Sequence, residues 1–251
     1  MAPRSTWKRA VLLVLLVLPF LVYFIFVYLS EETFFEKLAY AGPERVVEVQ
    51  EDDRSVRDTL PYQIPSYSFT TQHDTILSDE DLRGNIYVAN FFFSSCPTVC
   101  PAMNYQVQQV QNRFKGYDHF RIASFSVDPE YDTPEVLRDY ARDMNAIPGV
   151  WYFLTGDQDS IYSTAEDFFL NAMEDSTAPG GFLHSQHLVL VDWKGRIRSR
   201  KDENGNIKAV YDGTDLDEVN KLKDDIKVLI AEHEKWKSME ELRASKEENS
   251  R

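Results

Sequence analysis

Two thiols stand four positions apart, at Cys96 and Cys100, and they are the two cysteines of this 251-residue chain. The motif at residues 94–101 follows an apolar run, residues 86–93, and precedes a helical pattern. A strand that brings two thiols to the start of a helix builds a reactive or metal-binding site. A disulfide across so short a loop would add little stability, because the entropic gain grows with loop length. We therefore attribute the pair to chemistry rather than to stability.

The spacing of the two cysteines favours metal binding over redox cycling. Residues four apart in a regular helix hold their Cβ atoms about 5–6 Å apart, whereas a disulfide needs about 3.8 Å. Redox chemistry stays open as an alternative, because Cys96 on a loop, with Pro97 opening the helix, could swing to meet Cys100. We also expect the helix N-terminus to lower the pKa of the thiols, which would serve metal binding and nucleophilic attack alike.

The possible donors point to copper. Two thiolates and one imidazole make a soft site for Cu(I), or with a further ligand for Cu(II), whereas structural zinc wants four ligands. Of the five histidines, we interpret His73, His119 and His233 as surface residues. His184 and His187 precede a strand predicted to lie beside the thiol strand. Either could be the third ligand, and the residue types alone do not choose between them.

Strands and helices alternate along the chain, which predicts an α/β fold with a central mixed sheet flanked by helices. A thiol motif at the first strand–helix junction suggests a thioredoxin-like arrangement, with the site at the carboxyl ends of the strands. Strands are expected at residues 62–70 (an edge strand or hairpin), 86–93, 120–127 and 151–154, with a hairpin of 187–191 and 196–200. Helices are expected from 103 to about 116, from 133 or 134 to about 145, over 158–173, and from 216 to 236.

The N-terminal segment has the features of a membrane anchor. Residues 11–29 are apolar, interrupted only by Pro19, and at about 1.5 Å per residue such a helix spans a bilayer's hydrocarbon core. Because Arg4, Lys8 and Arg9 precede the run and acidic residues follow it, we expect a single-pass protein with a cytoplasmic N-terminus and an extracytoplasmic domain. No small-x-small site closes the run, which favours an uncleaved anchor over a signal peptide.

Composition and pattern together predict the domain organisation. We expect a cytoplasmic N-terminus (1–10), a transmembrane anchor (11–29), a linker (30–60), a thioredoxin-like domain (61–236) and a charged tail (237–251). The net charge of −14 argues against nucleic acid or an anionic membrane surface as a partner.

Three motifs resemble those of the Sco/SenC family, which are membrane-anchored copper proteins that serve cytochrome c oxidase assembly. The first is residues 91–101 with both cysteines, and the second is the acidic segment 126–134. The third is His184-Ser185, followed by an apolar strand that ends in the turn at 192–195. The resemblance covers roughly residues 60–235.

The resemblance implies a ligand set. In this family the third copper ligand is a histidine that opens a strand before a turn glycine. His184 stands eleven residues ahead of Gly195 and fits that interval, whereas His187 stands eight ahead. The resemblance therefore implies Cys96, Cys100 and His184 as copper ligands, with His187 as the alternative.

Asp128 resembles the family's acidic residue near the site, where it would hydrogen-bond around the ligands. Asp132, in the same segment, is interpreted instead as a cap of the following helix. The polar segment 201–209 is a longer hairpin loop than the family needs.

The resemblance to the Sco/SenC family implies two possible functions. The first is a copper metallochaperone that receives copper from an upstream donor and passes it to the dinuclear copper centre of an oxidase subunit. The alternative is a thiol–disulfide oxidoreductase that reduces the cysteines of that copper site through Cys96 or Cys100.

Overall fold

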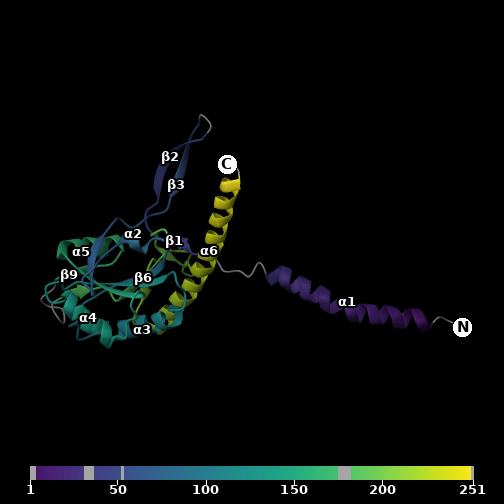
Figure 1. The fold of residues 1–251 in the computed structure, drawn as a ribbon, viewed down its shortest axis with the longest axis horizontal. Helices are drawn as coiled ribbons and strands as arrows, with labels where there is room; N and C mark the ends of the chain where they lie inside the picture. Colours follow the sequence, from purple (N-terminus) through teal and green to yellow (C-terminus); the bar gives the residue numbers. More distant parts are fainter. Residues whose placement is uncertain (1–3, 31–36, 52–53, 175–181, 250–251) are drawn as a thin grey trace. The chain divides into compact units, whose positions relative to one another are not determined.

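The computed structural model describes residues 4–30, 37–51, 54–174 and 182–249 (Figure 1). The chain divides into two compact units, Met1–Glu36 and Lys37–Arg251. The described part of the first unit is the helix α1 (Arg4–Ser30), which includes the apolar run predicted as the anchor. Among the described residues, no helix is both long and apolar enough to cross a bilayer. The anchor is therefore still a prediction from the sequence.

The second unit is built around a seven-stranded mixed sheet. Its three central strands are parallel, and the strands on either side of them are antiparallel. Across the sheet the order is β13 (Tyr211–Asp212), β11 (His187–Val191), β6 (Ile86–Phe92), β7 (Phe120–Ser126), β8 (Trp151–Thr155), β4 (Ser68–Thr71) and β5 (Ile76–Ser78).

The central strand β6 is covered on both faces, and all seven of its residues are buried. A continuous apolar run such as residues 86–93 is what a strand covered on both faces requires. The strands β6, β7 and β8 are joined by α3 (Val99–Phe114) and α4 (Pro134–Asp143). Right-handed crossovers in one direction put both helices on the same face, and Figure 1 shows α3 and α4 on one side of β6, with α2 (Asp79–Leu82) and α5 (Gln158–Asp167) on the other. The predicted α/β architecture is thus confirmed.

The helix expected over 158–173 is shorter than predicted. It ends at Asp167, and Phe169 adopts a positive φ of 60°. The amide of Leu170 then donates to the carbonyl of Ala165 at 2.9 Å, which closes the helix end. The next residues form β9 (Ala172–Glu174), which pairs with β10 (Phe182–His184) in a separate two-stranded sheet. The helical pattern did not show this hairpin.

The segment expected as a linker, 30–60, contains β-structure from residue 39 onward. The strand β1 (Ala39–Tyr40) pairs with β12 (Arg198–Ser199), and β2 (Arg45–Glu51) forms a hairpin with β3 (Arg54–Leu60). The side chains of Leu38 and Ala41 are 4 % and 2 % exposed, so this stretch belongs to the core. The compact unit accordingly begins at Lys37 rather than at residue 61.

The hairpin predicted at 187–191 and 196–200 is only partly formed. A single bridge joins Val191 to Ile197, because β12 pairs with β1 instead. The turn itself is as expected: Gly195 has a φ of +72°, and Asp192 Oδ1 accepts hydrogen bonds from the amides of Lys194 and Arg196.

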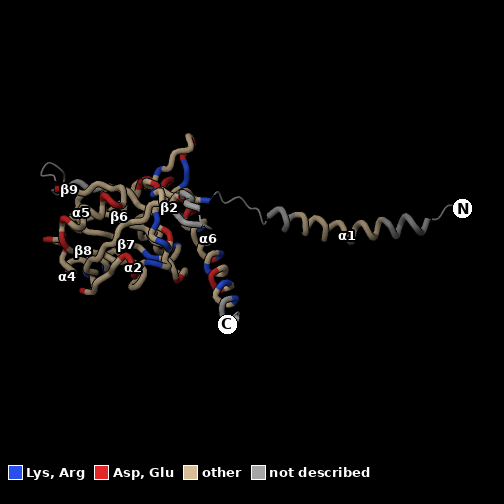
Figure 2. The backbone as a smooth tube through the Cα atoms, turned by 90° about the horizontal axis from the view of Figure 1, so that it is seen from above, with Lys and Arg blue, Asp and Glu red and all other residues tan. Residues whose placement is uncertain are grey.

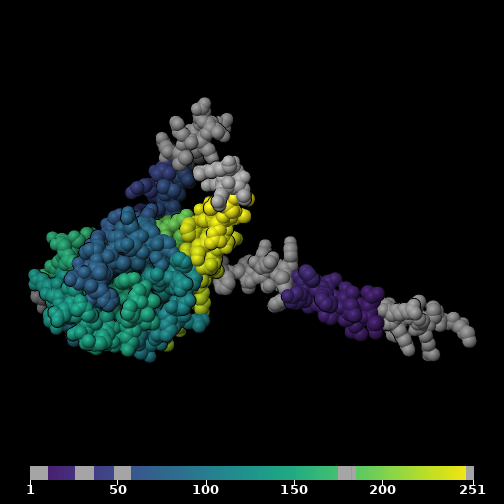
Figure 3. Space-filling view, in the orientation of Figure 1, coloured from purple at the N-terminus to yellow at the C-terminus, as the bar shows by residue number. Residues whose placement is uncertain are grey.

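The C-terminal helix α6 (Leu216–Asn249) continues beyond the predicted end at residue 236. Its first half packs on α3 and β6. Its second half stands clear of the body of the unit, as the yellow part of Figure 3 shows, and its side chains from Ser238 to Lys246 are exposed.

Candidate metal centre

The thiol motif lies at the carboxyl end of β6, as predicted. The strand ends at Phe92, the chain turns with the Cys96 amide donating to the Phe93 carbonyl at 3.2 Å, and α3 begins at Val99. Pro97 therefore lies in the turn with Cys96 rather than at the start of the helix, and Cys100 lies in the first helical turn. This placement gives the two thiols separate supports, one on a loop and one on a helix.

Both cysteines are thiols and both are buried. Cys96 is 7 % exposed and Cys100 is 1 % exposed. The Cys96 sulfur lies 3.7 Å from the Thr98 hydroxyl. Burial raises the pKa of the Cys100 thiol well above its ordinary value, although a hydrogen bond from the Phe93 backbone opposes the shift, and neighbouring Cys96 and Asp132 raise it further. The expectation that the helix N-terminus would lower the pKa is therefore wrong for Cys100, because burial outweighs the helix dipole there.

A buried carboxylate fixes the loop that carries Cys96. Asp132 is 0 % exposed. It accepts hydrogen bonds from the Ser94 amide at 3.0 Å, from the Ser94 hydroxyl and from the Ser126 hydroxyl. The sequence interpretation of Asp132 as a helix cap is wrong, because Thr133 caps α4 by accepting from the Val136 amide. The sequence does contain serines near the ends of two predicted strands, Ser94 and Ser126. It could not show that these serines hydrogen-bond to Asp132.

Asp128 lies nearer the surface than Asp132. Its carboxylate accepts from the Tyr131 amide at 3.4 Å, and its own amide donates to the Ser126 hydroxyl at 3.2 Å. Burial raises the pKa of the Asp128 carboxyl, and nearby acids, including Asp132 and Glu174, add to the shift. Asp128 is thus one of several acids on this side of the sheet.

The sequence did not point to a polar network behind Cys100. Asn104, one helical turn after Cys100, donates to the Tyr140 hydroxyl at 2.7 Å and accepts from the Asn90 amide at 3.4 Å. Burial raises the pKa of Tyr140 to about 12, and the neighbouring Cys100 and Asp132 contribute in the same direction. The network ties the first turns of α3 to β6 and α4. Asn104 and Tyr140 therefore hold the start of α3, and with it Cys100, in place against the sheet.

The two candidate histidines lie on different strands. His184 is the last residue of β10, in register with Ala172 of β9, and its side chain lies outside the described part of the structure. His187 opens β11, the antiparallel neighbour of β6. The His187 Nδ1 atom lies 2.5 Å from the Ser185 hydroxyl.

Among the residues whose side chains are described, no three His, Cys, Asp or Glu side chains form a group that could hold a metal ion. The described side chains bring together two thiols, and the assignment of a third ligand remains a prediction.

The other histidines divide between surface and core. His73 is exposed and His119 is half-buried, but His233 is 1 % exposed. The interpretation of His233 as a surface residue is therefore wrong. Its ring stacks on Trp193 at 4.8 Å and on Trp236 at 5.6 Å, contacts that amphipathic spacing could not reveal.

Charge is unevenly distributed over the second unit. Figure 2 shows acidic residues around α4, α5 and β9, whereas acidic and basic residues alternate along α6. The acids include Glu130, Asp132 and Glu174, all of which lie close enough to Asp128 to raise its pKa. Several acids therefore lie near the end of the sheet that carries the thiols.

The fold and the motif define a class of protein. The SCO1/SenC family model matches residues 58–215 of the chain, and the chain belongs to this family. A SCO1 protein homolog of Bacillus subtilis (strain 168) is 32 % identical over 161 residues, which are 63 % of this chain and 82 % of that relative.

Solved structures agree with this assignment. A SCO1/SenC family lipoprotein from Bacillus anthracis str. Ames has a TM-score of 0.58 and 27 % identity, covering 67 % of this chain and 95 % of its own. BsSco is described as a member of the Sco family of cytochrome c oxidase assembly proteins, and a disulfide switch is described in it. Its structure has a TM-score of 0.54 and 28 % identity, covering 69 % of this chain and 92 % of its own. Copper-bound ScoI of Bradyrhizobium japonicum has a TM-score of 0.50 and 25 % identity, covering 56 % of this chain and 90 % of its own. These likenesses confirm the thioredoxin-like mixed α/β fold.

Proposed function

We propose that this protein binds copper in the assembly of cytochrome c oxidase and passes it to the dinuclear copper centre of the oxidase subunit. The observation that carries the proposal is the buried pair Cys96 and Cys100 at the carboxyl end of β6 in a chain of the SCO1/SenC family. A copper-bound structure of a relative and the description of BsSco as an oxidase assembly protein support it.

The proposed ligands are the sulfurs of Cys96 and Cys100 and the imidazole of His184. Copper received from an upstream donor displaces the thiol protons, and ligand exchange then transfers it to the oxidase subunit. Soft thiolates favour Cu(I), and a further ligand would extend the site to Cu(II). Because the Cys100 thiol has a raised pKa, it keeps its proton until a cation offsets the charge of the thiolate. Asp128 is proposed to hydrogen-bond near the ligands.

Copper titration with histidine variants tests the ligand set. Reduced, anaerobic protein is titrated with Cu(I) against a competing chelator, and X-ray absorption reports the donor atoms. We expect one copper with two sulfurs and one nitrogen. His184→Ala should weaken binding by more than about 100-fold. His187→Ala is the matched control and should change little. The reverse ranking would move the ligand to His187.

A thiol–disulfide oxidoreductase is the second candidate. It is favoured by the interaction of the two thiols with each other and by the disulfide switch described for BsSco. One cysteine thiolate would attack the target's disulfide, the other cysteine would resolve the mixed disulfide, and two electrons would pass to the target. Absence of tight copper binding, together with rapid exchange against glutathione, would favour this function.

Attachment to a membrane through residues 11–29 is part of the proposal. The apolar run with Arg4, Lys8 and Arg9 upstream supports it, with the N-terminus cytoplasmic and the copper-binding domain outside. The full chain should remain with membranes after carbonate extraction, whereas a fragment of residues 37–251 should be released. Release of both would remove the anchor from the proposal.

A further inference from the structure

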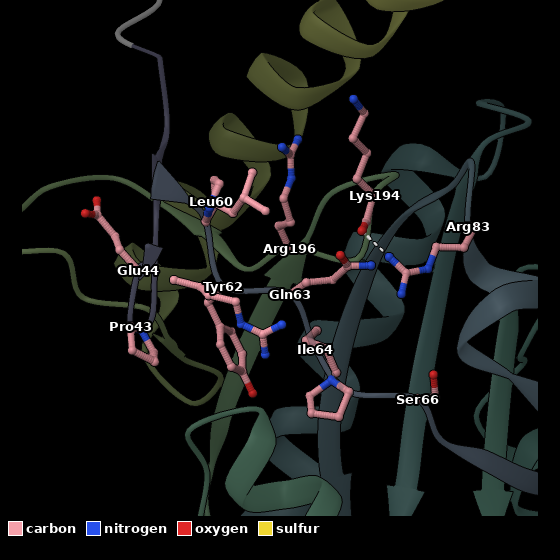
Figure 4. Close-up of a pocket in the computed structure, with 13 residues that line it drawn as sticks. Pro43, Glu44, Leu60, Tyr62, Gln63, Ile64, Ser66, Arg83, Lys194 and Arg196 are labelled. Atoms are coloured by element: carbon pink, nitrogen blue, oxygen red, sulfur yellow. Dashed lines mark hydrogen bonds between the residues drawn. The ribbon is translucent and has the colours of Figure 1, made fainter. Parts of the chain in front are cut away.

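A cleft of about 720 Å³ lies at the other end of the central sheet from the thiols (Figure 4). It is bordered by Arg83, which precedes β6, and by the turn after β11, the antiparallel neighbour of β6. Cys96 follows the opposite end of β6. The strand has seven residues, and at about 3.3 Å each it separates the cleft from the thiols by roughly 23 Å. The cleft is thus distinct from the candidate metal centre.

The lining of the cleft is cationic, although the whole chain carries a net charge of −14. Among the described residues, four basic side chains line it, and Glu44 is the one acid. The basic residues come from three separate parts of the sequence: Arg45 from β2, Arg83 from the end of α2, and Lys194 and Arg196 from the turn after β11.

Two of the cations are held in place by buried carboxylates. Arg83 pairs with Asp79 at 2.9 Å, and one of its Nη atoms donates to the Lys194 carbonyl. Arg196 donates to Asp192 from Nε at 2.9 Å and from Nη2 at 2.7 Å. These guanidinium groups are therefore positioned before any ligand arrives, which lowers the entropic cost of binding.

The other two cations, Arg45 and Lys194, have no carboxylate within ion-pair distance among the described side chains. The Lys194 ammonium lies 5.6 Å from the Trp236 ring centroid. Even with Glu44 in the lining, these two cations leave the cleft with a net positive charge that favours an anion. A phosphate monoester carries about −1.5 to −2 charges at neutral pH, and Arg and Lys are the usual binders of phosphate.

Most of the remaining lining of the cleft is apolar, with Glu44, Gln63 and Ser66 as its other polar residues. Leu60, 47 % exposed, lies beside Tyr62 in Figure 4, with Arg83 on the far side and Gln63, Arg196 and Lys194 between. An apolar wall next to fixed charges is the usual composition of a site for a small organic anion. A cavity of this volume also suits a ligand larger than inorganic phosphate alone.

We propose that this cleft binds a phosphate monoester that carries an apolar or aromatic group. Arg45 and Lys194 attract the phosphate, the pre-positioned Arg83 and Arg196 orient it, and Leu60 and Tyr62 contact the organic part. The phosphate belongs either to a free metabolite or to a lipid head group of the phosphatidic acid type. Both sources present the same dianionic group to the same cations.

Calorimetry on the detergent-solubilised full chain tests this proposal. Phenyl phosphate is the free probe, and micelles doped with short-chain phosphatidic acid, compared with phosphatidylcholine, are the lipid probe. The variant R45Q/K194Q removes two exposed charges from the cleft. The control R113Q/K115Q removes the same two kinds of charge at the end of α3, where both side chains are exposed.

Affinity for at least one probe should fall at least about tenfold in R45Q/K194Q and remain unchanged in R113Q/K115Q. The probe affected tells which source supplies the phosphate. Absence of binding by both probes would overturn the proposal, and so would equal losses in the two variants. Phenyl phosphate affinity should also persist in Cys96→Ser. The test of the cleft therefore does not depend on whether the protein binds copper.

Discussion

Asp132 is the residue that most directly shapes the loop before Cys96. Its carboxylate is fully buried and accepts from the Ser94 amide and from the hydroxyls of Ser94 and Ser126. Three donors from two serines thus satisfy this carboxylate in the interior. Removing it leaves those donors without their acceptor in a region from which water is excluded.

Asp132→Ala should therefore lower the free energy of unfolding by about 2–4 kcal/mol. Urea denaturation of the reduced, metal-free protein measures the change. Asp128→Ala is the matched control. Because Asp128 is only partly buried and accepts one long hydrogen bond, of 3.4 Å, its loss should cost less than about 1 kcal/mol. Equal costs for the two variants would contradict the role assigned to Asp132.

His233 is the second residue whose environment has a measurable consequence. Its pKa is lowered from 6.5 to about 4, chiefly by burial; the neighbouring His119 and Lys237 contribute to this shift, whereas Glu234 and Asp192 oppose it. The Tyr117 hydroxyl lies 2.9 Å from the His233 Nδ1 atom. The folded protein thus holds this ring neutral at pH values where an unfolded chain would protonate it.

Protonation of His233 should make the protein less stable in acid. Between pH 6.5 and pH 4 the unfolded chain binds a proton that the folded chain does not, so the free energy of unfolding falls as the pH falls. The full loss is at most about 3 kcal/mol. Urea denaturation at pH 7.5, 6 and 5 should show that His233→Phe flattens this slope (~1.4 kcal/mol per pH unit at most). The exposed His73→Gln should leave the slope unchanged, and a slope that persists in His233→Phe would rule out His233 as its source.

At the scale of the elements, hydrophobic periodicity correctly predicted the helices and strands whose pattern lies within their own segment of the sequence. The buried run at β6, the helix after the motif and the strands β7, β8 and β11 were all predicted, because each shows its own hydrophobic pattern. Pairing partners were harder to predict. β12 pairs with β1, about 160 residues away in the sequence, and α5 stops where Phe169 takes a positive φ.

The candidate site shows the same division. The position of Cys96 and Cys100 at the strand–helix junction followed from the sequence. Their burial, the raised pKa of Cys100 and the contact of Asp132 with Ser94 depend on side chains from other elements that pack over the motif. A sequence motif specifies which groups are present, but the surrounding packing determines their protonation and support.

The strand β1 yields a prediction about where the domain begins. Arg198 is fully buried and donates to the Leu38 carbonyl at 2.9 Å and to Glu232 at 2.8 Å. A fragment of residues 61–251 lacks Leu38. The buried Arg198 guanidinium then loses the carbonyl that accepts its hydrogen bond. This fragment should be less stable than a fragment of residues 37–251 by about 3 kcal/mol or more, as measured by urea denaturation. Coinciding unfolding curves would show that residues 37–60 contribute nothing.

At the scale of the whole second unit, the far half of α6 should contribute little to stability. A chain that ends at Lys237 loses only the exposed turns of α6 and should melt within about 2 °C of the full chain. A chain that ends at Ile230 also loses Glu232, His233 and Trp236, which contact the core. It should melt at least about 5 °C lower. Calorimetry compares the two, and similar melting temperatures would contradict this division of α6.

The acids near the thiols give the proposed copper site a negative field that reaches beyond its ligands. Glu130, Asp132 and Glu174 lie near Asp128 at this end of the sheet, so an approaching cation or basic partner is attracted toward it before contact. Such steering raises encounter rates and weakens as salt shortens the Debye length, which is about 8 Å at 0.15 M. Under the proposed function, a copper ion or a basic donor would therefore reach the thiol end faster at low salt than at high salt.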